Sequence, residues 1–143
     1  LDRSSAASDV YKRQTYQRMV KIFETLYAHC KYEVGEVTRS SDRFLVSVTV
    51  YPIDVISKAE KNGIYDFEKS YGERARKGEF DKLSDSEREE LWADGIITEV
   101  EKNLDNIGYL DPVTISLQVI IENDGYSIVD DDLVRMDELV ISY

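Results

Sequence analysis

The side chains with the types needed for chemistry are few in this sequence. His29 and Cys30 are adjacent, and they are its only histidine and its only cysteine. A cysteine nucleophile needs a base that faces it, but adjacent residues of a helix point about 100° apart. A zinc site needs several Cys or His ligands at short spacing, which one residue of each type cannot supply. The sequence therefore predicts no catalytic residue, no metal site and no cofactor, and His29 is read as an ordinary helix residue.

A run of acidic residues at 130–132 is the other candidate for a metal site. Aligning Gly125 with the invariant glycine of a calcium-binding EF-hand loop puts Ile120 where the first aspartate must stand, so that pattern fails. Carboxylates are favoured in the first turn of a helix, where they meet the positive end of its dipole. We therefore expect the run to begin a short last helix.

Aromatic residues are the best candidates for contact with a ligand. The chain has ten tyrosines, four phenylalanines and one tryptophan. Ligand pockets are often lined by such side chains, and Tyr51, Tyr65 and Trp92 are the candidates. Tyr51 belongs to the strand face opposite Val48 and Val50. Aromatic residues at helical spacing also commonly belong to a core, and this alternative stays open.

The clearest structural signal lies at residues 113–121, V-T-I-S-L-Q-V-I-I. Aliphatic residues occupy every second position, as expected for a strand with one buried face. The following Asn123-Asp124-Gly125 predicts a tight hairpin turn and a returning strand at 126–129. An earlier hairpin is predicted from strands at 32–38 and 44–51, with a bulge or bend at Gly35.

Helices are predicted around these hairpins from apolar residues spaced three and four apart. They cover residues 15–31 with Thr15 as N-cap, 55–77 with weak points at Gly63 and Gly72, and 84–107 with a Ser84–Glu87 capping box. The predicted order is α-β-β-α-α-β-β-α. This gives an α+β fold in which one antiparallel sheet of about four strands has its aliphatic face covered by helices.

The net charge of the chain limits which classes of partner it is expected to bind. The chain has 18 basic and 29 acidic residues, a net charge of −11. Nucleic acid and anionic membrane surfaces are bound through clustered Lys and Arg, so neither is an expected partner. No apolar run reaches the ~18 residues of a membrane span.

The first fourteen residues, L-D-R-S-S-A-A-S-D-V-Y-K-R-Q, resemble a translated sequencing-adapter tail of the kind found at the ends of metagenomic gene fragments. The alternative is a genuine polar, disordered arm. We expect residues 15–143 to form one α+β domain that lacks its true N-terminus, including any signal peptide.

Four stretches resemble small exported lipoproteins of Gram-positive gut bacteria, a group of domains of unknown function. They are Y-E-V-G-E-V at 32–37, V-T-V-Y-P-I-D at 48–54, L-D-N-I-G-Y at 104–109, and Y-S-I-V-D at 126–130 with Asp132-Leu133. The resemblance implies a cone-shaped fold of the nuclear transport factor 2-like or cystatin-like kind, and export through a lipidated cysteine upstream of residue 15.

The function expected from this resemblance is non-catalytic binding of a small molecule or a protein at the extracellular face of the cell membrane. The alternative function is a small cavity-type enzyme that uses a carboxylate or His29. The alternative location is cytoplasmic.

Overall fold

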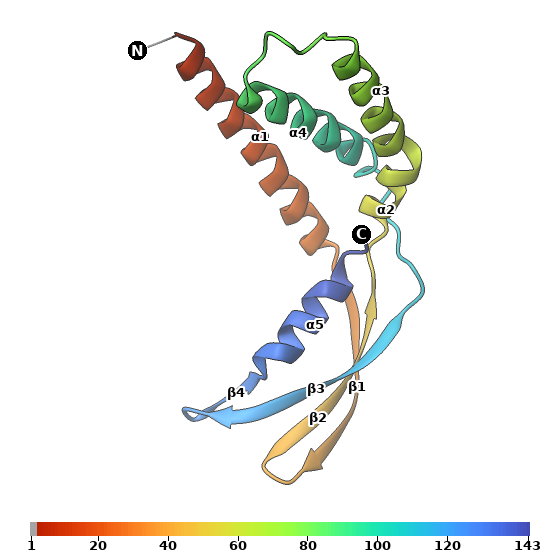
Figure 1. The fold of residues 1–143 in the computed structure, drawn as a ribbon. Coiled ribbons are helices and arrows are strands. Elements are labelled where there is room, and N and C mark those ends of the chain that lie inside the picture. Colours follow the sequence, from red (N-terminus) through yellow and green to blue (C-terminus); the bar gives the residue numbers. More distant parts are fainter. Residues whose placement is uncertain (1–2) are drawn as a thin grey trace. The chain divides into compact units, whose positions relative to one another are not determined.

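The computed structural model describes the backbone of residues 3–143 and the side chains from residue 9 onward, residue 11 excepted (Figure 1). The described elements are, in order, α1 (Arg3–Ala28), β1 (Lys31–Ser40), β2 (Arg43–Tyr51), α2 (Val55–Ala59), the π-helical turn η1 (Glu60–Ile64), α3 (Tyr65–Arg76), α4 (Asp85–Glu101), β3 (Val113–Glu122), β4 (Gly125–Ile128) and α5 (Asp130–Val140). An α+β fold with one four-stranded antiparallel sheet is confirmed.

The chain divides into two compact units, which we describe separately. Unit 1 combines the described residues up to Thr25 with Val55–Asn106, and unit 2 combines Leu26–Asp54 with Ile107–Tyr143. Unit 1 contributes seven buried apolar side chains: Ile22, Val55, Ala59, Ile64, Phe80, Ile97 and Val100. Unit 2 also contributes seven: Leu26, Val48, Val50, Ile53, Leu117, Val140 and Ile141. The prediction of a single domain remains a prediction.

The first helix is longer at its start than predicted. It begins at Arg3, so the interpretation of Thr15 as its N-cap is wrong. Residues 3–14 contain no glycine or proline, and their Ala, Lys, Arg and Gln are good helix formers, so nothing in this stretch ends the helix. At its other end the helix stops at Ala28 rather than near Lys31, because Lys31 already belongs to β1. The expectation that residues 1–14 are not native remains a prediction.

The helix predicted at 55–77 is three consecutive helical segments. A π-helical turn that contains Gly63, the first of the two predicted weak points, separates α2 from α3. Gly72 causes no break within α3. Gly78 ends the stretch with a φ of +79°, a left-handed conformation that favours glycine.

The capping box of α4 is confirmed. Ser84 Oγ accepts a hydrogen bond from the Glu87 backbone, and the Glu87 carboxylate accepts one from the Ser84 backbone. The predicted end near residue 107 is wrong, because α4 ends at Glu101. Leu104 and Ile107 continue the apolar spacing of the helix but lie beyond its end.

Within unit 2 the sheet has the strand order β1-β2-β3-β4, so the two predicted hairpins join through β2 and β3. The register of β1 shifts between Val34 and Val37, which places the predicted bulge at Gly35. Asn123 and Asp124 have φ of +49° and +63°, and they form the two-residue turn before β4.

The aliphatic face of the sheet is less covered than predicted. In β3 only Leu117 is buried, whereas Val113 and Ile121 at its two ends are exposed. Every residue of the edge strand β1 is exposed. Alternation of side chains identified the correct face of the sheet, but α5 packs mainly against the central strands β2 and β3.

Helix α5 also satisfies the edge of β3 beyond the short strand β4. The carboxylate of the buried Asp132 accepts a hydrogen bond from the Gln118 backbone at 2.7 Å. Arg135 donates to the Ser116 carbonyl at 2.9 Å and pairs with Asp132 at 2.8 Å. The predicted helix start at 130–132 is confirmed, and Asp132 additionally replaces a missing strand partner.

Candidate binding surface on helix α4

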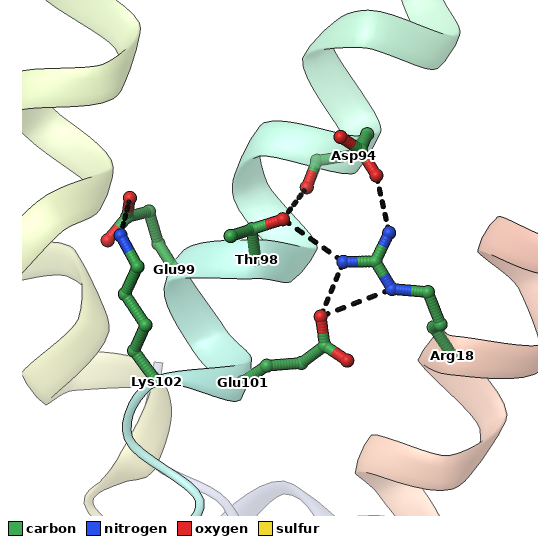
Figure 2. Close-up of polar contacts among 6 residues, drawn as sticks. All are labelled: Arg18, Asp94, Thr98, Glu99, Glu101 and Lys102. Atoms are coloured by element: carbon green, nitrogen blue, oxygen red, sulfur yellow. Dashed lines mark hydrogen bonds and ion pairs between the residues drawn. The ribbon is translucent and has the colours of Figure 1, made fainter.

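A cluster of polar side chains holds α1 beside α4 within unit 1 (Figure 2). Asp94, Thr98 and Glu101 lie four and three residues apart, so they share one face of α4. The Arg18 guanidinium donates to all three, with an N···O distance of 3.0 Å to the Thr98 hydroxyl and a bond from Nε to Glu101 at 3.1 Å. The hydrogen bond to Glu101 raises the pKa of Arg18, with burial opposing this and Asp94 adding to it.

Lys102 and Glu99 pair at 2.7 Å on another side of α4, away from Arg18 (Figure 2). The Arg18 cluster therefore fixes the spacing of the two helices, whereas the Lys102–Glu99 pair stays on the surface of one of them.

A stack of aromatic rings supports the other side of α4. Tyr71 lies 4.8 Å from Phe80 in a stacked arrangement and 5.9 Å from Phe67, measured between ring centroids. The Tyr71 hydroxyl donates to the Arg88 carbonyl at 2.9 Å. Phe67 contacts α4 where Gly95 has no side chain, and a Cβ there would stand only 2.0 Å from the ring. The Arg18 cluster thus holds the second half of α4 from α1, and α3 additionally holds the helix at Arg88, in its first half.

Two large apolar side chains on this half of α4 remain exposed. Leu91 is 38% exposed and Trp92 is 44% exposed. Trp92 lines an open hollow of about 410 Å³ together with Tyr71, Asp85, Arg88 and Glu89. Residues 85, 88, 89 and 92 have the three- and four-residue spacing of one helix face.

Two further hollows lie beside the same stretch. Leu91 lines one of about 300 Å³ with Leu83, Glu87 and Glu90. The other, of about 290 Å³, lies between α1 and α4 and is mostly apolar. Its walls are Lys12, Thr15, Tyr16 and Met19 from α1, and Ser86, Glu89, Glu90, Ala93 and Ile97 from α4. We call these three hollows and the residues that line them the α4 surface.

The three candidate aromatic residues have different environments. Trp92 lines the α4 surface, as described above. Tyr65, also in unit 1, is 62% exposed at the start of α3 and is not among the residues that line the three hollows. Tyr51 belongs to unit 2, where the Lys31 ammonium lies 4.2 Å from the centroid of its ring and 5.5 Å from that of Tyr109. An internal cation therefore already occupies the face of Tyr51.

His29 and Cys30 follow α1 in unit 2. The His29 side chain is exposed, and its carbonyl accepts a hydrogen bond from the Tyr109 hydroxyl at 2.7 Å. Burial raises the pKa of the Cys30 thiol, which disfavours the reactive thiolate. Among the residues that the structure describes, no group of three or more His, Cys, Asp or Glu side chains is arranged to hold a metal ion.

Unit 2 has a hollow of its own, of about 570 Å³. It lies where Ile53 pairs with both Tyr109 and Ile141. Its lining mixes apolar residues with two carboxylates: Pro52, Tyr109, Leu110, Asp111, Val113, Glu138, Leu139 and Ser142. Its aromatic lining residue is Tyr109, and Trp92 has no counterpart there.

Leu91, Glu89 and Gly95 were not singled out from the sequence. Leu91 fits the apolar spacing of its helix, and its adjacency to Trp92 places two large side chains on neighbouring parts of the surface. The signal for Gly95 was a glycine inside a strong helical pattern, which often marks a close approach of another element.

No protein-family model, curated protein or solved structure matches this chain. Across residues 3–143, none of the helices combines the length and the apolar character that crossing a membrane requires.

Proposed function

We propose that this protein is a non-catalytic binding module that contacts its partner through the α4 surface. The observation that carries the proposal is the exposure of Leu91 and Trp92, side by side, each beside its own hollow. Exposed apolar side chains that gather at hollows are typical of interaction sites, whereas singly scattered ones are ordinary. Trp is also among the residues that contribute most to binding energy at interfaces.

Rigid support for these side chains also favours binding. The helix that carries the α4 surface is anchored in its second half by the Arg18 cluster and is supported at Arg88 by Tyr71, which stacks between Phe67 and Phe80. A preorganised surface loses less conformational entropy on association, so more of the contact energy appears as affinity.

Catalysis has less support than binding in this arrangement. His29 and Cys30 are adjacent in the chain, and the His29 side chain is exposed. Burial raises the pKa of the Cys30 thiol, which disfavours its reactive form. A small enzyme that uses His29 would lose its activity in a His29→Ala variant, whereas a binding module would keep its partner.

As part of the same proposal, the protein is an exported lipoprotein whose fold is nuclear transport factor 2-like or cystatin-like. The four stretches of resemblance and the antiparallel sheet with its helices support this part. The genomic sequence upstream of the codon for Thr15 tests it. We expect a signal peptide that ends in small residues and a cysteine, and an ordinary start codon without such a segment contradicts export.

The binding role is tested by placing a photo-crosslinking amino acid at Leu91 in the full-length protein within its own cells. The matched control carries it at Glu68, an exposed position on α3 outside the three hollows. We expect a discrete adduct from position 91 and none from position 68. Equal labelling from both positions, or no adduct at 91, would contradict the proposal.

A further inference from the structure

The charge on α4 is predominantly negative. The helix D-S-E-R-E-E-L-W-A-D-G-I-I-T-E-V-E has seven acidic residues and one arginine, which gives a net charge of 1 − 7 = −6. In its second half two cations meet three carboxylates. Arg18 pairs with Asp94 and Glu101, and Lys102 pairs with Glu99.

Compensation is weaker in the first half, where most of the α4 surface lies and two cations meet four carboxylates. Asp85 pairs with Arg88 at 3.1 Å, and Glu90 pairs with Lys12 at 3.9 Å. The Glu87 carboxylate accepts a hydrogen bond within the capping box, which leaves its charge unneutralised. Glu89 is exposed and has no ion-pair partner among the described residues. Surplus negative charge therefore lies at the rims of the same hollows that Leu91 and Trp92 line.

Each hollow combines an apolar wall with a carboxylate. Glu89 lines both the hollow of Trp92 and the groove between α1 and α4. Glu87 and Glu90 line the hollow of Leu91. Arg88 lines the first hollow and Lys12 the groove, but carboxylates outnumber cations at all three places, so an anionic ligand is disfavoured there. A purely apolar ligand would remove water from the carboxylates without pairing them. The matching chemistry is a segment that carries apolar side chains and cations together.

We propose that the α4 surface binds a basic, amphipathic peptide segment of a partner protein. Its apolar residues contact Leu91 and Trp92 and fill the groove beside Met19, while its Lys or Arg side chains pair with Glu89 and Glu87. This inference rests on the proposed binding function and adds the chemical class of the partner.

Trp92 is the only tryptophan of the chain, so its fluorescence reports directly on this surface. The probe is a synthetic peptide of about 15 residues, long enough to form a helix on contact, with Leu and Lys at amphipathic spacing. One control peptide replaces every Lys by Glu, and a second replaces every Leu by Ser. We expect a saturable change in Trp92 emission with the first peptide alone, and weaker affinity at higher salt concentration.

Matched variants separate this site from general attraction between opposite charges. Glu89→Lys reverses a charge at the hollows, and Glu68→Lys makes the same change on α3. We expect the first variant to weaken binding about three- to tenfold, and the second to change it less than about twofold. Leu91→Ser should weaken binding while the net charge is unchanged. Far-UV circular dichroism checks that each variant is folded.

Equal effects of Glu89→Lys and Glu68→Lys, or equal responses to all three peptides, would overturn the inference. A crosslink at position 91 without peptide binding also overturns it and leaves the binding role standing. Loss of both signals overturns the two proposals together.

Discussion

At the scale of single residues, Gly95 shows how a position without a side chain can determine packing. The ring of Phe67 fills the space where a Cβ would be, and this contact brings α3 against α4. The carboxylate of Asp132 plays a comparable part in unit 2, where it satisfies a backbone N–H at the edge of β3. Neither role follows from residue type, because both depend on which element arrives from elsewhere in the chain.

Gly95→Ala should be destabilising even though alanine is the better helix former. The new methyl group would lie 2.0 Å from Phe67 Cζ, so the ring or the helix must shift, and overpacking typically costs about 1–3 kcal/mol. Gly72→Ala is the control, since its new Cβ meets nothing closer than Arg76 at 3.7 Å and should stabilise by about 0.5–1 kcal/mol. Urea unfolding of both variants measures the difference, and a stabilised Gly95→Ala would contradict the packing.

Cys30 should react slowly with alkylating reagents. Burial raises the pKa of its thiol, so the thiolate fraction at a given pH is below that of an ordinary cysteine. The rate of iodoacetamide labelling, followed against pH, should have its midpoint above the ordinary thiol value. A midpoint below that value would indicate an activated cysteine.

At the scale of elements, local sequence patterns predicted which helices and strands exist better than where each one ends or how far it is covered. The capping box, the turn at Asn123 and Asp124 and the bulge at Gly35 are confirmed, because each depends on a few neighbouring residues. The end of α4 was placed too late, since Leu104 and Ile107 continue its apolar spacing past Glu101. Of the aromatic candidates, Trp92 lines the α4 surface, but the sequence could not indicate that Lys31 covers Tyr51.

Arg18→Gln should loosen the contact between α1 and α4. It removes one cation from three acceptors, and because the side chain is partly exposed we expect a loss of about 1 kcal/mol that shrinks at high salt. Lys102→Gln makes the same change in net charge on the other side of α4 (Figure 2) and should cost less. Thermal unfolding in low and high salt compares them, and equal losses would contradict a special role for Arg18.

The two faces of β3 should respond differently to a new charge. Leu117 is 3% exposed, so Leu117→Asp buries an unpaired carboxylate at a cost of several kcal/mol, out of a total stability of about 5–15 kcal/mol. The Gln118 side chain accepts a hydrogen bond from Arg43 at 2.6 Å, so the carboxylate of Gln118→Asp stays near a cation and costs much less. Melting temperatures that fall equally in both variants would contradict the facing of the strand.

At the scale of the whole molecule, the two units are interleaved along the chain. The chain passes from one unit to the other after Thr25, after Asp54 and after Asn106. Neither unit is therefore one continuous segment. The net charge of −11 spans both of them and disfavours compact states at low ionic strength through self-repulsion.

The expectation that residues 15–143 form a single domain predicts that both units unfold in one transition. Trp92 fluorescence reports on unit 1, and amide signals from β2 and β3 report on unit 2, so the two probes should give the same urea midpoint. Two separate midpoints would show that the units are independently stable.

The pairing of β2 with β3 has a consequence during synthesis on the ribosome. The β1–β2 hairpin emerges first, but β3 follows only after about 60 more residues, which takes roughly 3–12 s at the usual rate of translation. Throughout this interval the nascent hairpin has an unpaired inner edge beside Val48 and Val50, which are buried in the finished fold. The nascent chain thus carries an unpaired strand edge, a known site of aggregation, while the helices between the two hairpins are being made.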